Sequence, residues 1–142
     1  MDKKPRTIKN NSIGHPGRLL RSALQRGQAI HAKKCRELDL TTMQSSALGA
    51  LNQTGPCTQR ALSHAIDMEL SNLNGLIKRL LDKKLISQNQ DPKDARSKII
   101  SLTNKGQRFA AKLIPLSADV ADELLAPLSK ADAKIFIQML EK

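Results

Sequence analysis

Apolar residues recur at helical spacing in two stretches near the start of the chain. Residues 17–36 predict a first amphipathic helix, because arginines fall mainly between its apolar positions Leu19, Leu20, Ala23, Leu24 and Ile30. Thr41 and Gln44 have the spacing of a capping box. The apolar positions that follow predict a second helix, and Gly55 and Pro56 end it.

Two further helices follow that turn. Residues 58–66 predict a short helix, with Ala61, Leu62 and Ala65 facing inward and Gln59, Arg60 and Ser63 facing outward. Asp67 is expected in the turn. Residues 70–84 have the clearest helical period, with one half of the wheel filled by Leu70, Leu73, Leu76, Ile77, Leu80 and Leu81. The other half is polar and holds Ser71, Asn72, Asn74, Gly75, Lys78 and Arg79.

The pattern then changes to two short strands. Residues 86–90 and 98–102 predict a hairpin, because the polar segment 91–97 between them contains a proline that cannot join a strand ladder. Thr103 is a suitable cap for a long helix over 104–125, which Pro115 is expected to kink or interrupt. Ser129 and Asp132 start a last helix. The chain is therefore predicted to be mainly α with a small β-hairpin.

The charge of the chain points to a polyanionic partner. Its formal net charge is +11, and residues 1–36 hold ten lysines and arginines against Asp2 alone. Lysine and arginine clusters bind phosphates by releasing condensed counterions, which favours nucleic acid. Residues 1–16 are interpreted as a basic, flexible arm. No segment resembles a signal peptide or a membrane span, so a cytoplasmic protein without a membrane partner is expected.

Several motifs, in this order, resemble the MarR family of bacterial regulators: Leu40 to Gln44, Gly55 to Gln59, the Leu73 to Leu80 pattern, Asp91-Pro92-Lys93-Asp94-Ala95-Arg96, Ile100 to Thr103, and Lys105-Gly106. The resemblance spans residues 17–142. It implies a winged helix-turn-helix, with a DNA-binding lobe over 41–103 and dimerisation helices over 17–40 and 104–142, all in one compact domain. A homodimer on a pseudo-palindromic operator follows from that resemblance.

The residues of the predicted DNA-binding lobe suggest how it would contact DNA. Ser71, Asn72 and Asn74 are candidates for base edges, and Gly75 allows close approach. The candidates for phosphate contacts are Thr58, Gln59, Lys78, Arg79 and Lys98. The resemblance places the wing at the minor groove, where Arg96 would insert and Asp94 would orient it through an ion pair.

The resemblance also implies a repressor released by a small effector bound between the lobe and the dimerisation helices. An aromatic acid or an acyl thioester is expected, with Arg21 pairing with a carboxylate and Gln25 nearby. A thiol sensor is the alternative: Cys35 has Lys33, Lys34 and Arg36 around it, which favours thiolate. No disulfide with Cys57 is expected.

Other classes of function remain as alternatives or are excluded. A low-specificity architectural protein could use the same fold and charge, and a winged helix could bind a protein instead of DNA. No phosphate loop, nucleophile elbow or paired acids occur, so an enzyme is not expected. The three histidines are scattered, and neither a metal site nor a cofactor is predicted.

Overall fold

The strongest helical pattern in the sequence folds as α4, Leu70–Asp82. Its apolar face is buried through Leu73, Leu76, Ile77 and Leu80, and the opposite face is exposed. The computed structural model describes residues 15–141, with only the backbone of Ala95 described. The basic arm expected over residues 1–16 therefore lies outside the described residues up to residue 14.

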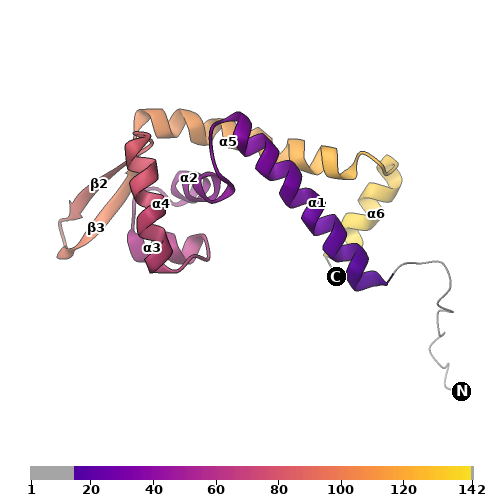
Figure 1. Cartoon of the computed structure of the whole chain (residues 1–142), viewed down its shortest axis with the longest axis horizontal. Coiled ribbons are helices and arrows are strands. Elements are labelled where there is room, and N and C mark those ends of the chain that lie inside the picture. Colours follow the sequence, from indigo (N-terminus) through magenta and orange to yellow (C-terminus); the bar gives the residue numbers. More distant parts are fainter. Residues whose placement is uncertain (1–14, 142) are drawn as a thin grey trace, which may run out of the picture.

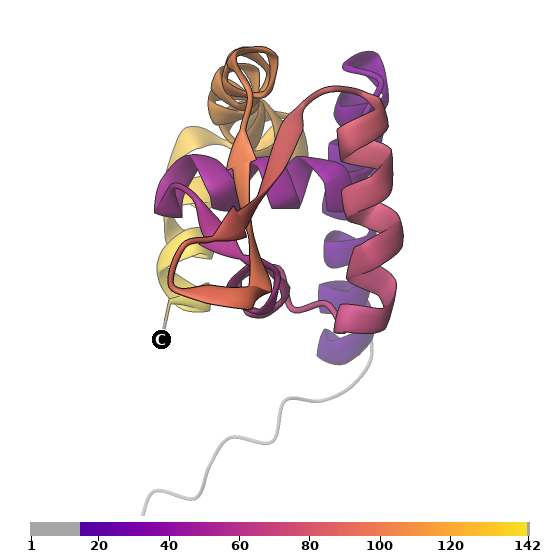
Figure 2. The same ribbon diagram turned by 90° about the vertical axis from the view of Figure 1, so that its left-hand side faces the viewer.

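The remaining helices confirm the predicted mainly α fold. Their bounds are α1 Pro16–Glu37, α2 Thr42–Thr54, α3 Gln59–Ala65, α5 Asn104–Leu125 and α6 Lys130–Leu140. Thr41 and Gln44 form the predicted capping box, and Thr103 and Ser129 cap α5 and α6. Figures 1 and 2 show α2, α3, α4 and the sheet gathered at one end, while α1, α5 and α6 extend from it.

The sheet has one strand more than the sequence predicted. β2, Ile86–Asp91, and β3, Asp94–Leu102, form the hairpin, and β1, Cys57–Thr58, pairs with the other edge of β3. The wing strands also extend closer to the tip than expected. A two-residue strand carries no periodic signal, so only its tertiary partner reveals it.

Packing keeps α5 continuous through Pro115. A proline inside a helix loses a hydrogen bond and crowds the preceding turn, which led to the prediction of a kink or a break. Leu113 and Leu116 are buried on either side of it, and α5 packs against α1 and α2. Helical stability in proteins comes mostly from such packing, so the helix is not interrupted.

The first turn of α5 approaches the start of β2 unusually closely at Gly106. Gly106 is buried, and a Cβ atom built on it would lie 1.9 Å from the Leu85 carbonyl oxygen. Only glycine fits here. The backbone N–H of Gly106 donates to Thr103 Oγ1 at 3.0 Å, which fixes the cap of the helix at the same point.

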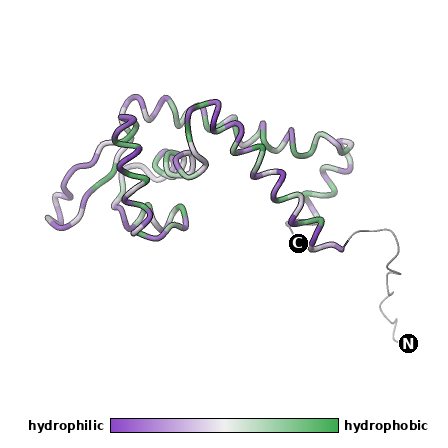
Figure 3. The backbone as a smooth tube through the Cα atoms, viewed as in Figure 1, coloured by the Kyte–Doolittle hydropathy of each residue, from purple (hydrophilic) through white to green (hydrophobic). Residues whose placement is uncertain are grey.

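The core belongs mainly to the lobe. Its fully buried large side chains are Cys35, Leu48, Leu62, Leu73, Leu80, Leu85 and Ile100. In Figure 3, hydrophobic positions also recur along the arm that α1, α5 and α6 form. On α6 no residue is buried, although Ile135, Ile137 and Met139 are large and apolar. This arm therefore exposes hydrophobic surface.

Candidate nucleic-acid interface

A groove joins α3, the start of α4 and the wing strand β3. Its walls are Thr58, Gln59, Arg60, Leu70, Asn74, Asp94, Arg96, Ser97 and Lys98. Six of the eleven DNA-contact residues predicted from the sequence line it: Thr58, Gln59, Asn74, Asp94, Arg96 and Lys98. Three cations face one carboxylate in this groove, so its charge suits a polyanion.

β1 brings α3 to the wing. Cys57 pairs with Ile100 and Thr58 with Ile99, which places the start of α3 beside Lys98. Thr58 is also the N-cap of α3, since its Oγ1 accepts a hydrogen bond from the Ala61 N–H at 3.2 Å. The hydroxyl hydrogen of Thr58 stays available for a phosphate oxygen, and the cap fixes where it lies.

The exposed face of α4 carries the other predicted contacts, outside the groove. Ser71, Asn72, Gly75, Lys78 and Arg79 are all exposed. The Ser71 hydroxyl donates to Glu69 Oε2 at 3.4 Å, so this hydroxyl is not wholly free. A Cβ built on Gly75 meets no atom within 4 Å, which leaves open space along that face.

The turn between α3 and α4 is fixed by Ser63, which the sequence placed outward. Ser63 is instead buried, and its hydroxyl donates to the Met68 carbonyl while the Met68 N–H donates to the Ser63 carbonyl at 3.0 Å. Its short polar side chain therefore serves the backbone rather than solvent. Asp67 adopts the left-handed conformation, with φ of 49°, as a turn residue can.

Asp94 orients the wing backbone rather than the Arg96 guanidinium. Its Oδ1 accepts from the Arg96 N–H at 2.9 Å, and Asp91 Oδ1 accepts from the Lys93 N–H at the same distance. The expected ion pair with Arg96 is absent: over residues 15–141 the ion pairs join Lys34 to Glu123 and Lys83 to Asp39. The exposed Arg96 side chain is therefore not neutralised by Asp94.

Sequence reasoning missed three residues of the groove. Arg60 and Ser97 adjoin predicted contacts, so their position beside Gln59 and Lys98 was the available signal. Leu70 was assigned to the buried face of its helix, yet it is 44% exposed. It lies in the first turn of α4, beyond the reach of the core.

A separate cleft lies between α2 and α5, where the lobe meets the arm. It measures about 840 Å³ and is lined partly by Ser45, Ser46, Gly49, Asn52, Gln53 and Ser117, with His31 of α1 at its edge. The predicted effector residues are not in it. Arg21 lines a small pocket at the start of α1 with His15, Gly17 and Arg18, and Gln25 is exposed on α1.

The two cysteines are poorly placed for peroxide sensing. Cys35 is 0% exposed, which removes the access that a sensor thiol needs, so the structure argues against the redox role considered for it. Burial raises the pKa of the Cys57 thiol, although a hydrogen bond with Thr54 acts in the opposite direction. Both thiols are free.

Two further searches cover the same described residues. Across 15–141, His, Cys, Asp and Glu side chains form no group of three or more that could hold a metal ion. Within that range, no helix combines the length and the apolar character needed to cross a membrane.

Comparison with known proteins gives consistent results. Residues 38–97 match the sequence model of the MarR family. The transcriptional repressor NicR of Pseudomonas putida is 29% identical over 142 residues, covering 100% of this chain and 87% of that protein. A crystal structure of a probable transcriptional regulator from Pseudomonas aeruginosa is 30% identical, with a TM-score of 0.75, over 90% of this chain and 96% of that one.

A third relative is described together with its ligand. The structure of Bordetella bronchiseptica BpsR, reported for the regulation of its DNA binding by 6-hydroxynicotinic acid, is 28% identical with a TM-score of 0.73. The match covers 88% of this chain and 95% of that chain.

Proposed function

This chain belongs to the MarR family of DNA-binding transcriptional regulators, and we propose that it is a homodimeric repressor that a small organic acid releases from a pseudo-palindromic operator. The observation that carries this proposal is the groove, which unites α3, the recognition helix α4 and the wing on one surface. Asn74 is suited to a base edge there, and Arg96 to a narrow minor groove. Thr58, Gln59 and Lys98 supply phosphate contacts that fix the register.

The arm of α1, α5 and α6 supports the homodimer. An apolar groove of about 830 Å³ runs between these helices, lined mainly by leucines together with Val120 and Phe136. Exposed contiguous apolar surface marks an interaction site in a protein of this size. A second copy of the chain, presenting the same arm about a two-fold axis, would cover both apolar surfaces at once.

Replacing Leu24 by glutamate should separate the protomers. Leu24 is 61% exposed in a single chain and lines the apolar groove, so a charge there is tolerated by the fold but not by a buried interface. We expect a monomer in light scattering, and operator affinity reduced by roughly 100-fold or more because two half-sites no longer bind together. Ala111→Glu adds the same charge outside the groove and should leave a dimer. A dimeric Leu24→Glu protein would contradict this interface.

The cleft between α2 and α5 is the proposed effector site. Its size suits a small aromatic acid, and it separates the DNA-binding lobe from the arm. The hydroxyls of Ser45, Ser46 and Ser117 and the His31 imidazole offer hydrogen bonds to a carboxylate. The ligand of BpsR, 6-hydroxynicotinic acid, has this chemistry, so hydroxylated aromatic acids are the first effectors to test.

A gel-shift titration tests the function directly. Duplex DNA from upstream of the protein's own gene is titrated with unlabelled random duplex as competitor, then with hydroxylated aromatic acids, their thioesters and peroxide. Binding that survives competitor and is lost with one acid supports the proposal. Equal binding to random DNA would instead identify an architectural protein. Loss with peroxide alone would restore thiol sensing.

Replacing Gly49 by leucine should make the protein insensitive to its effector. Gly49 lies in α2 and lines the cleft, and a Cβ there meets no atom within 4 Å, so a leucine side chain has room to fill the ligand's place. We expect operator binding close to that of the unmodified chain, but no release at effector concentrations that release the unmodified protein. Gly49→Ala is the smaller control and should keep its response. Undiminished release of the leucine variant would place the effector elsewhere.

A further inference from the structure

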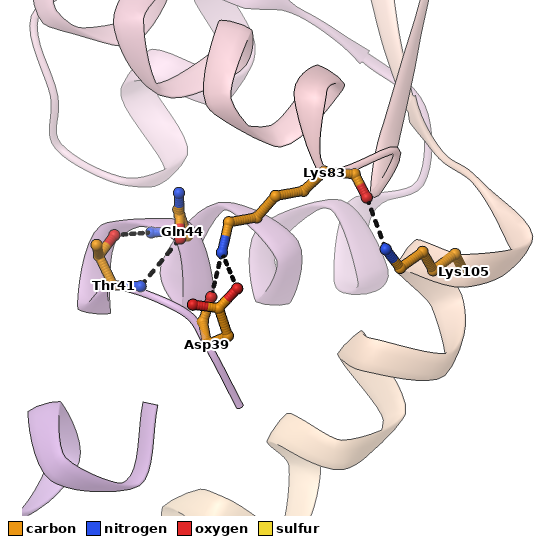
Figure 4. Close-up of polar contacts among 5 residues, drawn as sticks. All are labelled: Asp39, Thr41, Gln44, Lys83 and Lys105. Atoms are coloured by element: carbon orange, nitrogen blue, oxygen red, sulfur yellow. Dashed lines mark hydrogen bonds and ion pairs between the residues drawn. The ribbon is translucent and has the colours of Figure 1, made fainter. Parts of the chain in front are cut away.

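The C-terminal end of α4 is attached to the turn between α1 and α2 by a single lysine. Lys83 is the C-cap residue of α4, and its Nζ donates to Asp39 Oδ2 at 2.7 Å and also to the Asp39 backbone carbonyl. Figure 4 shows the lysine stem reaching across to both oxygens. One ammonium group therefore connects the recognition helix to the end of α1.

The same end of α4 is attached to the start of α5. Lys105 Nζ donates to the Lys83 carbonyl at 2.9 Å, and the Thr103 hydroxyl donates to the Lys84 carbonyl at 2.7 Å. The Thr103 N–H donates to the Leu85 carbonyl at 3.1 Å. The carbonyls that follow α4 are thus held by the residues that begin the long helix of the arm.

The conformation of Asp39 makes this contact possible. Its φ is 54°, in the left-handed region, and its N–H donates to the Arg36 carbonyl at 2.9 Å, so the turn is fixed by its own backbone. The hydrogen bond and the charge of Lys83, with a smaller contribution from Lys105, lower the pKa of the Asp39 carboxyl. The carboxylate is therefore ionised at neutral pH.

This contact stabilises the fold little, because it lies at the surface. The Asp39 side chain is 97% exposed and that of Lys83 31%, and exposed ion pairs are screened by water and salt. Its geometry has a larger consequence than its energy. It fixes the direction of a helix whose base-reading residues lie toward the opposite end.

We propose that Lys83 is a positioning residue: by joining α4 to the α1–α2 turn, it sets the direction of the recognition helix relative to the arm, and so the half-site spacing that the dimer accepts. This inference rests on the proposed function. α4 has 13 residues and is about 20 Å long, so a tilt of about 10° at the Lys83 end moves the other end by about 3 Å. That displacement is close to one base-pair step.

The test compares operator duplexes that differ only in half-site spacing. The parent duplex is selected from a random pool by the unmodified protein, and two others carry one base pair more or fewer between the half-sites. The unmodified protein should prefer the parent spacing. For Lys83→Met we expect this preference to fall by about threefold or more. Lys83→Arg keeps a donor to both oxygens and should restore most of it.

Lys84→Met is the matched control, since it removes an equal charge one residue along. The exposed Lys84 side chain makes no contact in the structure, so its preference for spacing should remain that of the unmodified protein. If Lys83→Met lost affinity equally for all three spacings, or kept the full preference, Lys83 would have no positioning role. Failure of the unmodified protein to select any two-fold-symmetric duplex would instead overturn the proposed function.

Discussion

Replacing Arg96 by alanine should weaken operator binding by about 1–3 kcal/mol per half-site, which is roughly 5- to 150-fold for each half-site lost. Arg96 is exposed at the wing side of the groove, and its guanidinium is not paired with Asp94. Its charge is therefore free to enter a narrow minor groove, where the negative potential is enhanced. The measurement is a fluorescence anisotropy titration of an operator duplex at fixed salt.

Two companion variants separate this effect from charge and from folding. Arg108→Ala removes the same side chain from an exposed position on α5, outside the groove, and should change affinity little. Arg96→Lys keeps the charge without the planar guanidinium and should fall between the two. The thermal midpoint of Arg96→Ala should match that of the unmodified protein, since Asp94 binds the backbone N–H that the variant retains. Operator affinity that is unchanged in Arg96→Ala would exclude the wing from DNA binding.

Replacing Gly106 by alanine should destabilise the fold by about 3 kcal/mol or more, because overpacking of a buried site against the backbone cannot be relieved by rotating a side chain. The added Cβ would lie 1.9 Å from the Leu85 carbonyl oxygen. Relief requires α5 to move away from the start of β2, which also breaks the Thr103 cap. A thermal midpoint lower by about 10 °C is expected in a calorimetric scan.

Gly49→Ala provides the comparison, because it adds the same methyl group to a helix where nothing lies within 4 Å. Alanine favours helix over glycine by about 0.8–1.0 kcal/mol, so this variant should be as stable as the unmodified protein or more so. Equal stability of the two variants would show that the contact between α5 and β2 adapts more readily than its geometry indicates.

Local signals made much of this fold predictable. The Thr41 and Gln44 box marked the start of α2, and the leucines of α4 gave its buried face, because both patterns lie within a few residues of one another. Partners distant in the sequence limited the rest. β1 depends on β3, and the burial of Ser63 depends on a bond to Met68 across the next turn.

The candidate groove was recovered for a different reason. Thr58, Asn74 and Arg96 are polar residues at exposed positions of predictable elements, so their exposure followed from periodicity and their grouping from the resemblance. The role of Asp94 could not be derived in this way. A carboxylate beside an arginine satisfies either its guanidinium or its N–H, and only the path of the backbone at the wing decides between them.

The pairing of Cys57 with Ile100 closes a loop in the chain that contains α3, α4 and β2. Segments enclosed by such a non-local contact tend to open together, as one cooperative unit. Amide hydrogens in α3, α4 and the wing should therefore exchange with a common free energy of opening. On this basis, DNA binding is lost in one step when the lobe opens, since recognition helix and wing have no folded state in which one is intact without the other.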